Sequence, residues 1–193
     1  MMHRPIAALA IAIPLAACGL NSVPTAEETA KARWADVQNE YQRRADLIPN
    51  LVATVKGYAK QESDVLTRVT EARASAGRVQ VTGEQLSDPA AVQRFAAAQN
   101  AVTLSLQRLQ EAYPDLKSNQ NFLSLQSQLE GTENRITIAR RDYNEAVQAY
   151  NTRIRTFPDA VGARIFYGAK PKVPFQAQAG AETAPTVNFG NAS

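Results

Sequence analysis

Residues 34–58 read WADVQNEYQRRADLIPNLVATVKGY, and an apolar residue returns in this stretch at almost every seventh position. Two such rows lie three residues apart, so both fall on one face of an α-helix, as the a and d positions of a heptad repeat do. We predict one long helix from Thr25 to Ala76, with Thr25 and Glu28 as a capping box at its start. The first row is Trp34, Tyr41, Ile48, Val55, Glu62, Val69 and Ala76, and the second is Val37, Arg44, Leu51, Tyr58, Val65 and Ala72.

The heptad spacing predicts two further helices. Asp88-Pro89 is a helix start, because the Asp side chain can cap and the missing proline N–H costs nothing at the first helical position. That helix stops at Pro114. A third helix begins between Asp115 and Asn119 and ends near Thr156.

These elements define the expected fold class and domain organisation. Nothing in the sequence reads as a confident strand, and short connections join the helices. We predict an all-α, antiparallel up-down bundle of three long helices over residues 25–168, with a short C-terminal helix or an extended tail. Residues 169–193 are rich in Pro, Gly and Ala and are predicted to be extended or disordered.

The predicted helix lengths do not match one another. At 1.5 Å per residue the helices measure about 75, 40 and 57 Å. The second therefore covers only the upper half of the first, and Trp34, Tyr41 and Ile48 in the lower half need another cover. The C-terminal segment, a second copy or a partner could supply it.

Pro49 lies at the junction of the two halves. It removes the hydrogen bond to the Ala45 carbonyl, so a kink is expected. A sharp turn at Pro49 would fold the lower arm back as a fourth helix, whereas a bent helix would stay continuous. We favour the bent helix, because the seven-residue phase passes through Pro49 unbroken.

The N-terminus predicts a lipid anchor. A basic start and an apolar run too short to span a bilayer indicate a signal peptide over residues 1–17. Leu15-Ala16-Ala17-Cys18 resembles the lipobox of bacterial lipoproteins, which implies a diacylglyceryl group and an N-acyl chain on Cys18 and a tether over residues 18–24. In the alternative, Cys18 is only a small residue near a secretory cleavage site. We expect a lipid-anchored envelope protein, facing the periplasm from the outer membrane if the host has two membranes.

Composition narrows the classes of function. The chain has 21 basic and 18 acidic residues, and no segment gathers the basic stripe that nucleic acid would need, so we expect no nucleic-acid partner. The one His is His3 and the one Cys is Cys18, so the mature chain would lack both imidazole and free thiol. This argues against His-based and Cys-based catalysis and the usual zinc sites. We expect no enzyme, metal or cofactor beyond the acyl chains, although carboxylate or tyrosine chemistry stays open.

Two groups of polar residues are candidates for a binding surface. The first is near Pro49, where a freed carbonyl could join a polar pocket, unless Arg44 simply pairs across the bundle and fixes its register. The second is a Tyr-Asn pair that repeats one heptad apart, unless both tyrosines only pack at the bundle edge. The candidates are Tyr41, Arg44, Asp46 and Asn50, followed by Arg140, Tyr143, Asn144, Tyr150 and Asn151.

Several blocks resemble one family. Residues 39–52, NEYQRRADLIPNLV, and residues 113–116, YPDL, are similar to signatures of the LemA family. The resemblance extends through residues 133–151 and through Phe157-Pro158, Pro174-Phe175 and residues 185–189. It implies an all-helical protein associated with the cell envelope, without a settled activity. Relatives often carry an N-terminal membrane helix, whereas this chain offers a lipobox.

Three functions fit these observations. The first is a non-enzymatic scaffold or adaptor that binds another envelope protein or a second copy of itself, beside the membrane lipid that holds Cys18. The second is a sensor for a small ligand, lipid or peptide with a polar pocket near Pro49. The third, a carboxylate-based or tyrosine-based hydrolase, needs facing carboxylates with a raised pKa.

Overall fold

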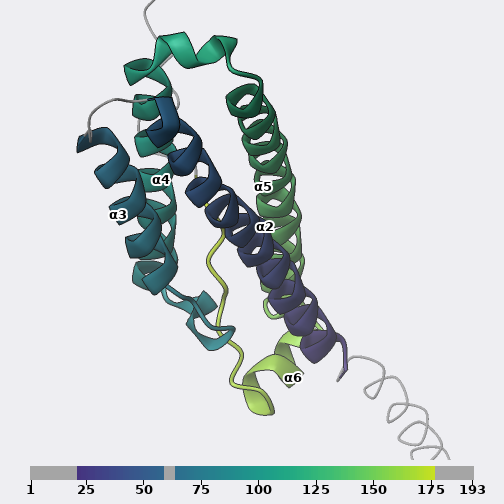
Figure 1. Ribbon diagram of the computed structural model, residues 1–193. Helices are drawn as coiled ribbons and strands as arrows, with labels where there is room; N and C mark the ends of the chain where they lie inside the picture. The colour runs from purple at the N-terminus through teal and green to yellow at the C-terminus, as the bar shows by residue number, and fades with distance from the viewer. Residues whose placement is uncertain (1–20, 59–63, 177–193) are drawn as a thin grey trace, which may run out of the picture.

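The computed structural model describes residues 21–58 and 64–176, and every regular element in these ranges is helical. The body of the bundle consists of α2 (Ser22–Tyr58), α3 (Asp64–Arg78), α4 (Pro89–Ala112) and α5 (Gln120–Arg153). Successive helices run in opposite directions, with α2 packed along α5 and α3 packed along α4 (Figure 1). The predicted all-α antiparallel bundle is therefore confirmed.

The first predicted helix is divided in two. α2 ends at Tyr58 and α3 begins at Asp64, where we expected unbroken helix as far as Ala76. The repeat did not reveal this reversal, because Val69 and Ala76 of α3 face the same core and keep the seven-residue phase. The predicted first helix was longer than its neighbours because it combined two helices, α2 and the antiparallel α3.

Pro49 lies inside α2, and the helix continues through it as the favoured arrangement predicted. The Ala45 carbonyl is nevertheless not free, because Arg73 Nε of α3 donates a hydrogen bond to it at 2.7 Å. Further down, Trp34 Nε1 donates to the Val81 carbonyl at 2.9 Å. These two bonds hold α3 and the chain that follows it antiparallel to α2.

The predicted stops and caps of the later helices match the structure. The Asp88 carboxylate accepts a hydrogen bond from the Ala90 N–H at 2.9 Å at the start of α4. A 3₁₀ turn, η2 (Pro114–Ser118), follows α4 and leads to α5, whose first turn is capped by the Asn119 side chain. A second 3₁₀ turn, η1 (Glu84–Ser87), precedes α4.

The start of α2 differs from the prediction. Thr25 does not cap the helix, since its hydroxyl donates to the Asn21 carbonyl at 2.7 Å from within the first turns. The helix begins at Ser22, inside the expected tether, because Val23 is buried against Tyr150 and Ala163. Residues 18–20 and the signal peptide lie outside the described residues.

The lower half of α2 is covered by the chain's own C-terminal segment. Residues 169–176, here called the strap, are extended and run beside α2 and α5 (Figure 1). Phe175 of the strap is buried in one cluster with Trp34 and Tyr41, while Ile48 lies in a second cluster with α3 and the upper half of α4. The C-terminal segment, one of the three covers considered, therefore covers Trp34 and Tyr41, whereas α3 and α4 cover Ile48. Residues 169–193 were predicted to be extended or disordered. The strap is extended, but its Phe175 side chain is part of the core.

A short helix, α6 (Asp159–Ile165), links α5 to the strap and lies beside the beginning of α2 (Figure 1). This accounts for the short C-terminal helix in the prediction. Among the helices of the described ranges, none combines the length and the apolar character needed to cross a membrane.

Candidate functional site

The Tyr-Asn repeat of α5 holds the strap. The Asn144 side chain donates to the Phe175 carbonyl at 3.0 Å and accepts from the Phe175 N–H at 2.8 Å. The Asn151 side chain makes the same pair of bonds with Lys172, both at 2.8 Å. Each amide thus replaces the backbone partner that a neighbouring β-strand would supply.

The spacing of the two asparagines explains this arrangement. Seven residues of α-helix rise about 10.5 Å, and three residues of extended chain span about 10 Å. Asn144 and Asn151 can therefore bind Phe175 and Lys172, which are three residues apart, without strain in either element. The strap runs antiparallel to α5.

The backbone of Val173, between these two residues, is bonded as well. The Val173 N–H donates to the Leu86 carbonyl at 2.8 Å, and the Val173 carbonyl accepts from the Tyr143 hydroxyl at 2.9 Å. Pro174 has no N–H to satisfy. Burial raises the pKa of Tyr143, so its phenol is held as a neutral donor.

Lys172 ties the strap to α2. Its side chain is buried and its Nζ lies 3.1 Å from Glu27 Oε1 and 5.1 Å from the centre of the Tyr150 ring. Tyr150 is itself buried, and burial together with the nearby Glu27 carboxylate raises its pKa. The ion pair and the cation–π contact compensate for the removal of the ammonium group from water.

Phe175 completes an aromatic cluster. Its ring stacks on Trp34 with centroids 5.4 Å apart and meets Tyr143 edge-on at 5.7 Å. Phe95 of α4 contacts the same tryptophan at 5.1 Å. The outer face of Phe175 is covered by the Arg140 guanidinium, 4.8 Å from the ring centre. The strap therefore connects α2, α4 and α5 through one side chain.

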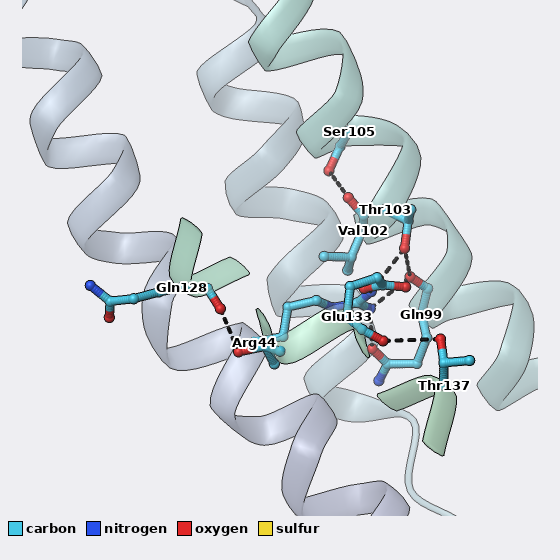
Figure 2. Close-up of polar contacts among 9 residues, drawn as sticks. Arg44, Gln99, Val102, Thr103, Ser105, Gln128, Glu133 and Thr137 are labelled. Atoms are coloured by element: carbon cyan, nitrogen blue, oxygen red, sulfur yellow. Dashed lines mark hydrogen bonds and ion pairs between the residues drawn. The ribbon is translucent and has the colours of Figure 1, made fainter. Parts of the chain in front are cut away.

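Arg44 is a buried junction between three helices (Figure 2). Its Nη2 donates to the backbone carbonyl and to the side-chain oxygen of Gln99, both at 2.9 Å. Its Nη1 donates to Thr103 Oγ1 at 2.8 Å and to Glu133 Oε2 at 3.2 Å. The guanidinium also lies 4.9 Å from the centre of the Tyr41 ring. Arg44 therefore pairs across the bundle, as one of its two interpretations predicted.

A small pocket of about 210 Å³ beside Ala45 and Ile48 is lined by two of the four proposed residues, Tyr41 and Arg44, but not by Asp46 or Asn50. Asp46 is exposed and accepts a hydrogen bond from Gln42 on its own helix at 2.7 Å. Asn50 is exposed as well, and its carbonyl accepts from Thr54. Both residues lie apart from Arg44 because they occupy the solvent side of α2. The heptad phase already distinguishes the buried face, which carries Arg44, from the exposed face, which carries Asp46 and Asn50. The prediction grouped residues of both faces because they lie close to Pro49 in the sequence.

A groove of about 540 Å³ lies between α4, α5 and the strap. Tyr41, Arg44 and Arg140 contribute to its lining, and Glu133 stands at its edge with a side chain 49% exposed. Burial raises the pKa of Tyr41 although the two guanidinium groups oppose this shift, so the phenol is neutral. The groove thus combines two positive charges with one carboxylate. The remaining lining residues are Pro89, Val92, Gln93, Ala96, Ala97, Gln99, Asn100, Thr103, Val173, Pro174, Phe175 and Gln176.

The structure therefore sorts the sequence candidates into groups. Arg44, Tyr41 and Arg140 meet in the groove, whereas Tyr143, Asn144, Tyr150 and Asn151 form the seat of the strap. Cys18 lies outside the described residues. Sequence reasoning missed Lys172, Phe175 and Arg73 as partners, although the Tyr-Asn repeat was the signal that a second segment must lie along α5.

Comparison with known proteins agrees with this architecture. The family model for the LemA family matches residues 33–189, a range that contains the groove, the Tyr-Asn repeat and the strap. The chain is similar to the protein LemA of Metamycoplasma hominis, with 26% identity over 118 residues. That match covers 61% of this chain and 51% of the relative, so the chain spans about half of the relative's length.

Proposed function

This chain belongs to the LemA family, and we propose that it is a lipid-anchored, non-enzymatic adaptor of the cell envelope. In this proposal Cys18 carries the acyl chains, and the groove between α4, α5 and the strap binds an acidic segment of another envelope protein. The observation that carries the proposal is the pair of guanidinium groups, Arg44 and Arg140, at the same groove.

The two arginines differ in what they can still bind. A guanidinium has five N–H donors, and Arg44 already makes four hydrogen bonds. Arg140 stacks on Phe175 and makes a long contact of 3.4 Å with the Gln176 carbonyl. Arg140 therefore has donors left for a carboxylate, which guanidinium groups bind in a two-pronged geometry. Arg44 adds positive charge at the floor.

The walls of the groove suit a peptide. Ala96, Ala97 and Pro174 supply apolar surface, and Gln93 and Asn100 supply amide groups that can bond to a peptide backbone. Aromatic stacking and hydrogen bonds already order the strap side, so little entropy is lost there on binding.

The test is recovery of a partner from envelope membranes. The intact lipoprotein is purified after mild cross-linking, beside Arg140→Gln and the matched control Arg141→Gln, whose side chain is 69% exposed on the same helix. We expect Arg140→Gln to lose the partner and Arg141→Gln to keep it. Equal recovery with Arg140→Gln, at unchanged thermal stability, would refute the groove as the binding site, and absence of any partner from the wild type would refute the adaptor.

A small anionic ligand is the second candidate for the same groove. The volume of about 540 Å³ lies within the usual range for small-molecule sites, roughly 300–1,000 Å³. The expected result is that short dicarboxylates or acidic dipeptides raise the thermal midpoint of the wild type and not of Arg140→Gln. No stabilisation by any of them would exclude this second candidate.

A further inference from the structure

The end of the bundle formed by α6 carries an unusual concentration of exposed apolar side chains. Phe157 is 86% exposed, Ile165 is 68% exposed and Phe166 is 66% exposed. Val161 and Tyr167 are exposed in the same short stretch. Large apolar residues scattered singly on a surface need no explanation, but five within eleven residues mark an interaction surface.

The geometry of α6 turns these side chains outward. Gly162 and Ala163 are buried, and Ala163 packs against Val23 of α2 and Tyr150 of α5. Val161 and Ile165 are four residues apart and share the opposite face of the helix, which is exposed. α6 is therefore apolar on both sides, and the outer side has no protein cover among the described residues.

Basic residues flank the apolar side chains along the sequence, and Arg155 and Arg164 line one shallow hollow with Val161 and Ile165. Between residues 153 and 170 the chain carries four basic residues and one acidic residue, Asp159. The four basic residues, all exposed, are Arg153, Arg155, Arg164 and Lys170. Exposed apolar side chains interspersed with Arg and Lys are the pattern of surfaces that dock into the headgroup region of an anionic bilayer.

This end of the bundle is also where the predicted anchor emerges. α2 begins here at Ser22, and the first described residue, Asn21, is three residues after Cys18. An extended chain spans at most about 3.6 Å per residue, so the three residues from Cys18 to Asn21 can reach no further than about 11 Å. Acyl chains on Cys18 would hold the α6 end close to the bilayer, whereas the opposite end with η2 lies at the far end of the bundle (Figure 1).

We propose that the surface formed by Phe157, Val161, Ile165, Phe166 and their basic neighbours docks on an anionic lipid bilayer. The bundle then stands on the membrane with its long axis away from it, and the groove is held at a fixed height above the lipid. This inference rests on the proposed anchor for its orientation, because Cys18 selects which end meets the membrane.

Site-directed labelling tests the docking. The protein is purified with its acyl chains and reconstituted in phosphatidylcholine vesicles with and without phosphatidylglycerol. One cysteine is introduced by Phe166→Cys or, as the control at the other end of α5, by Leu123→Cys, which replaces a residue 45% exposed. Each cysteine carries a polarity-sensitive fluorophore, and the vesicles carry a lipid-linked quencher.

We expect the label at position 166 to be shifted to the blue and quenched several-fold more than the label at position 123. Anionic lipid should strengthen this difference, and Arg164→Glu or high salt should weaken it. A label at position 166 that is as accessible to water as the label at position 123 would overturn the proposal. Circular dichroism confirms that each variant is folded.

The docking surface and the anchor can fail separately. The mass of the purified protein shows whether Cys18 is acylated, and an unmodified Cys18 would refute the anchor. In that case Cys18→Ser versions of the two labelled proteins, each with a single thiol, are mixed with phosphatidylglycerol vesicles, where quenching at position 166 supports the docking surface and its absence refutes it.

Discussion

Arg73 Nε donates a hydrogen bond at 2.7 Å to the Ala45 carbonyl, the oxygen that Pro49 leaves without a helical partner. A proline inside a helix both removes one hydrogen bond and exposes an acceptor. Here a side chain from the antiparallel neighbour takes the place of the missing N–H. A defect in α2 is thereby turned into a contact that aligns α2 with α3.

This contact predicts a non-additive pair of substitutions. Arg73→Ala should lower the free energy of unfolding by about 1–2 kcal/mol, because a charged donor to a partly buried carbonyl is lost. In a Pro49→Ala background the new N–H can satisfy Ala45, so the same Arg73→Ala change should cost less. Urea denaturation of the four proteins measures the coupling. Equal costs in both backgrounds would show that Arg73 does not act through this carbonyl.

The seat of the strap gives a second prediction. Asn151→Ala removes two hydrogen bonds to Lys172 and should cost about 1–3 kcal/mol. It should also speed trypsin cleavage after Lys172, a residue only 4% exposed in the folded chain. Asn134→Ala, at an exposed position of the same helix, is the matched control. Mass spectrometry of the fragments identifies the cleavage site. Equal rates of cleavage after Lys172 in both variants would show that Asn151 does not hold the strap against α5.

The heptad rows predicted the fold because burial follows them closely. Trp34, Tyr41, Ile48 and Val55 are all buried on α2, and so is Val37 of the second row. Even Arg44, a charged residue in an apolar row, is 2% exposed. The pattern reports which face is inward, and in a bundle that face is enough to define the class of fold.

The same pattern could not place the reversal or the strap. Val69 and Ala76 of α3 face the core in the same seven-residue phase that an unbroken helix would have. The repeat therefore does not indicate that the chain reverses direction between α2 and α3. The strap is extended and has no helical period at all. Its position depends on side-chain to backbone bonds from Asn144 and Asn151, which are contacts over more than twenty residues of sequence. In the sequence these pairs are visible only as the Tyr-Asn repeat of α5, and no pattern in the strap identifies its partner.

Replacement of Arg44 is expected to lower the free energy of unfolding far more than replacement of an exposed arginine. Arg44→Ala leaves Gln99 and Thr103 without their donor and should lower the free energy of unfolding by about 3 kcal/mol. Arg44→Lys should recover only part of this loss, because an ammonium group cannot reproduce the fork of a guanidinium. The matched control, Arg43→Ala, removes a side chain that is 65% exposed and should change stability by less than about 0.5 kcal/mol. Chemical denaturation measures all three, and a small effect of Arg44→Ala would mean that water replaces the network.

Alkaline pH should unfold the protein through its buried tyrosines. Burial raises the pKa of Tyr143, Tyr150 and Tyr41 in the folded state above the ordinary value of about 10. Above that value the unfolded chain has lost phenolic protons that the folded chain retains, so the free energy of unfolding falls as pH rises. The stabilisation is complete below about pH 10 and is lost between the unfolded and folded pKa values.

Comparison of the wild type with Tyr143→Phe isolates one of these phenols. The variant should be less stable at pH 8 by about 1 kcal/mol, because the hydrogen bond to the Val173 carbonyl is gone. Above pH 10 its stability should fall less steeply, since one proton fewer distinguishes the two states. Lys31, whose pKa is raised by its hydrogen bond to Glu28, destabilises both proteins alike as it deprotonates and cancels in the difference. Parallel slopes for the two proteins would mean that Tyr143 reaches solvent before the bundle unfolds, and that the strap opens first.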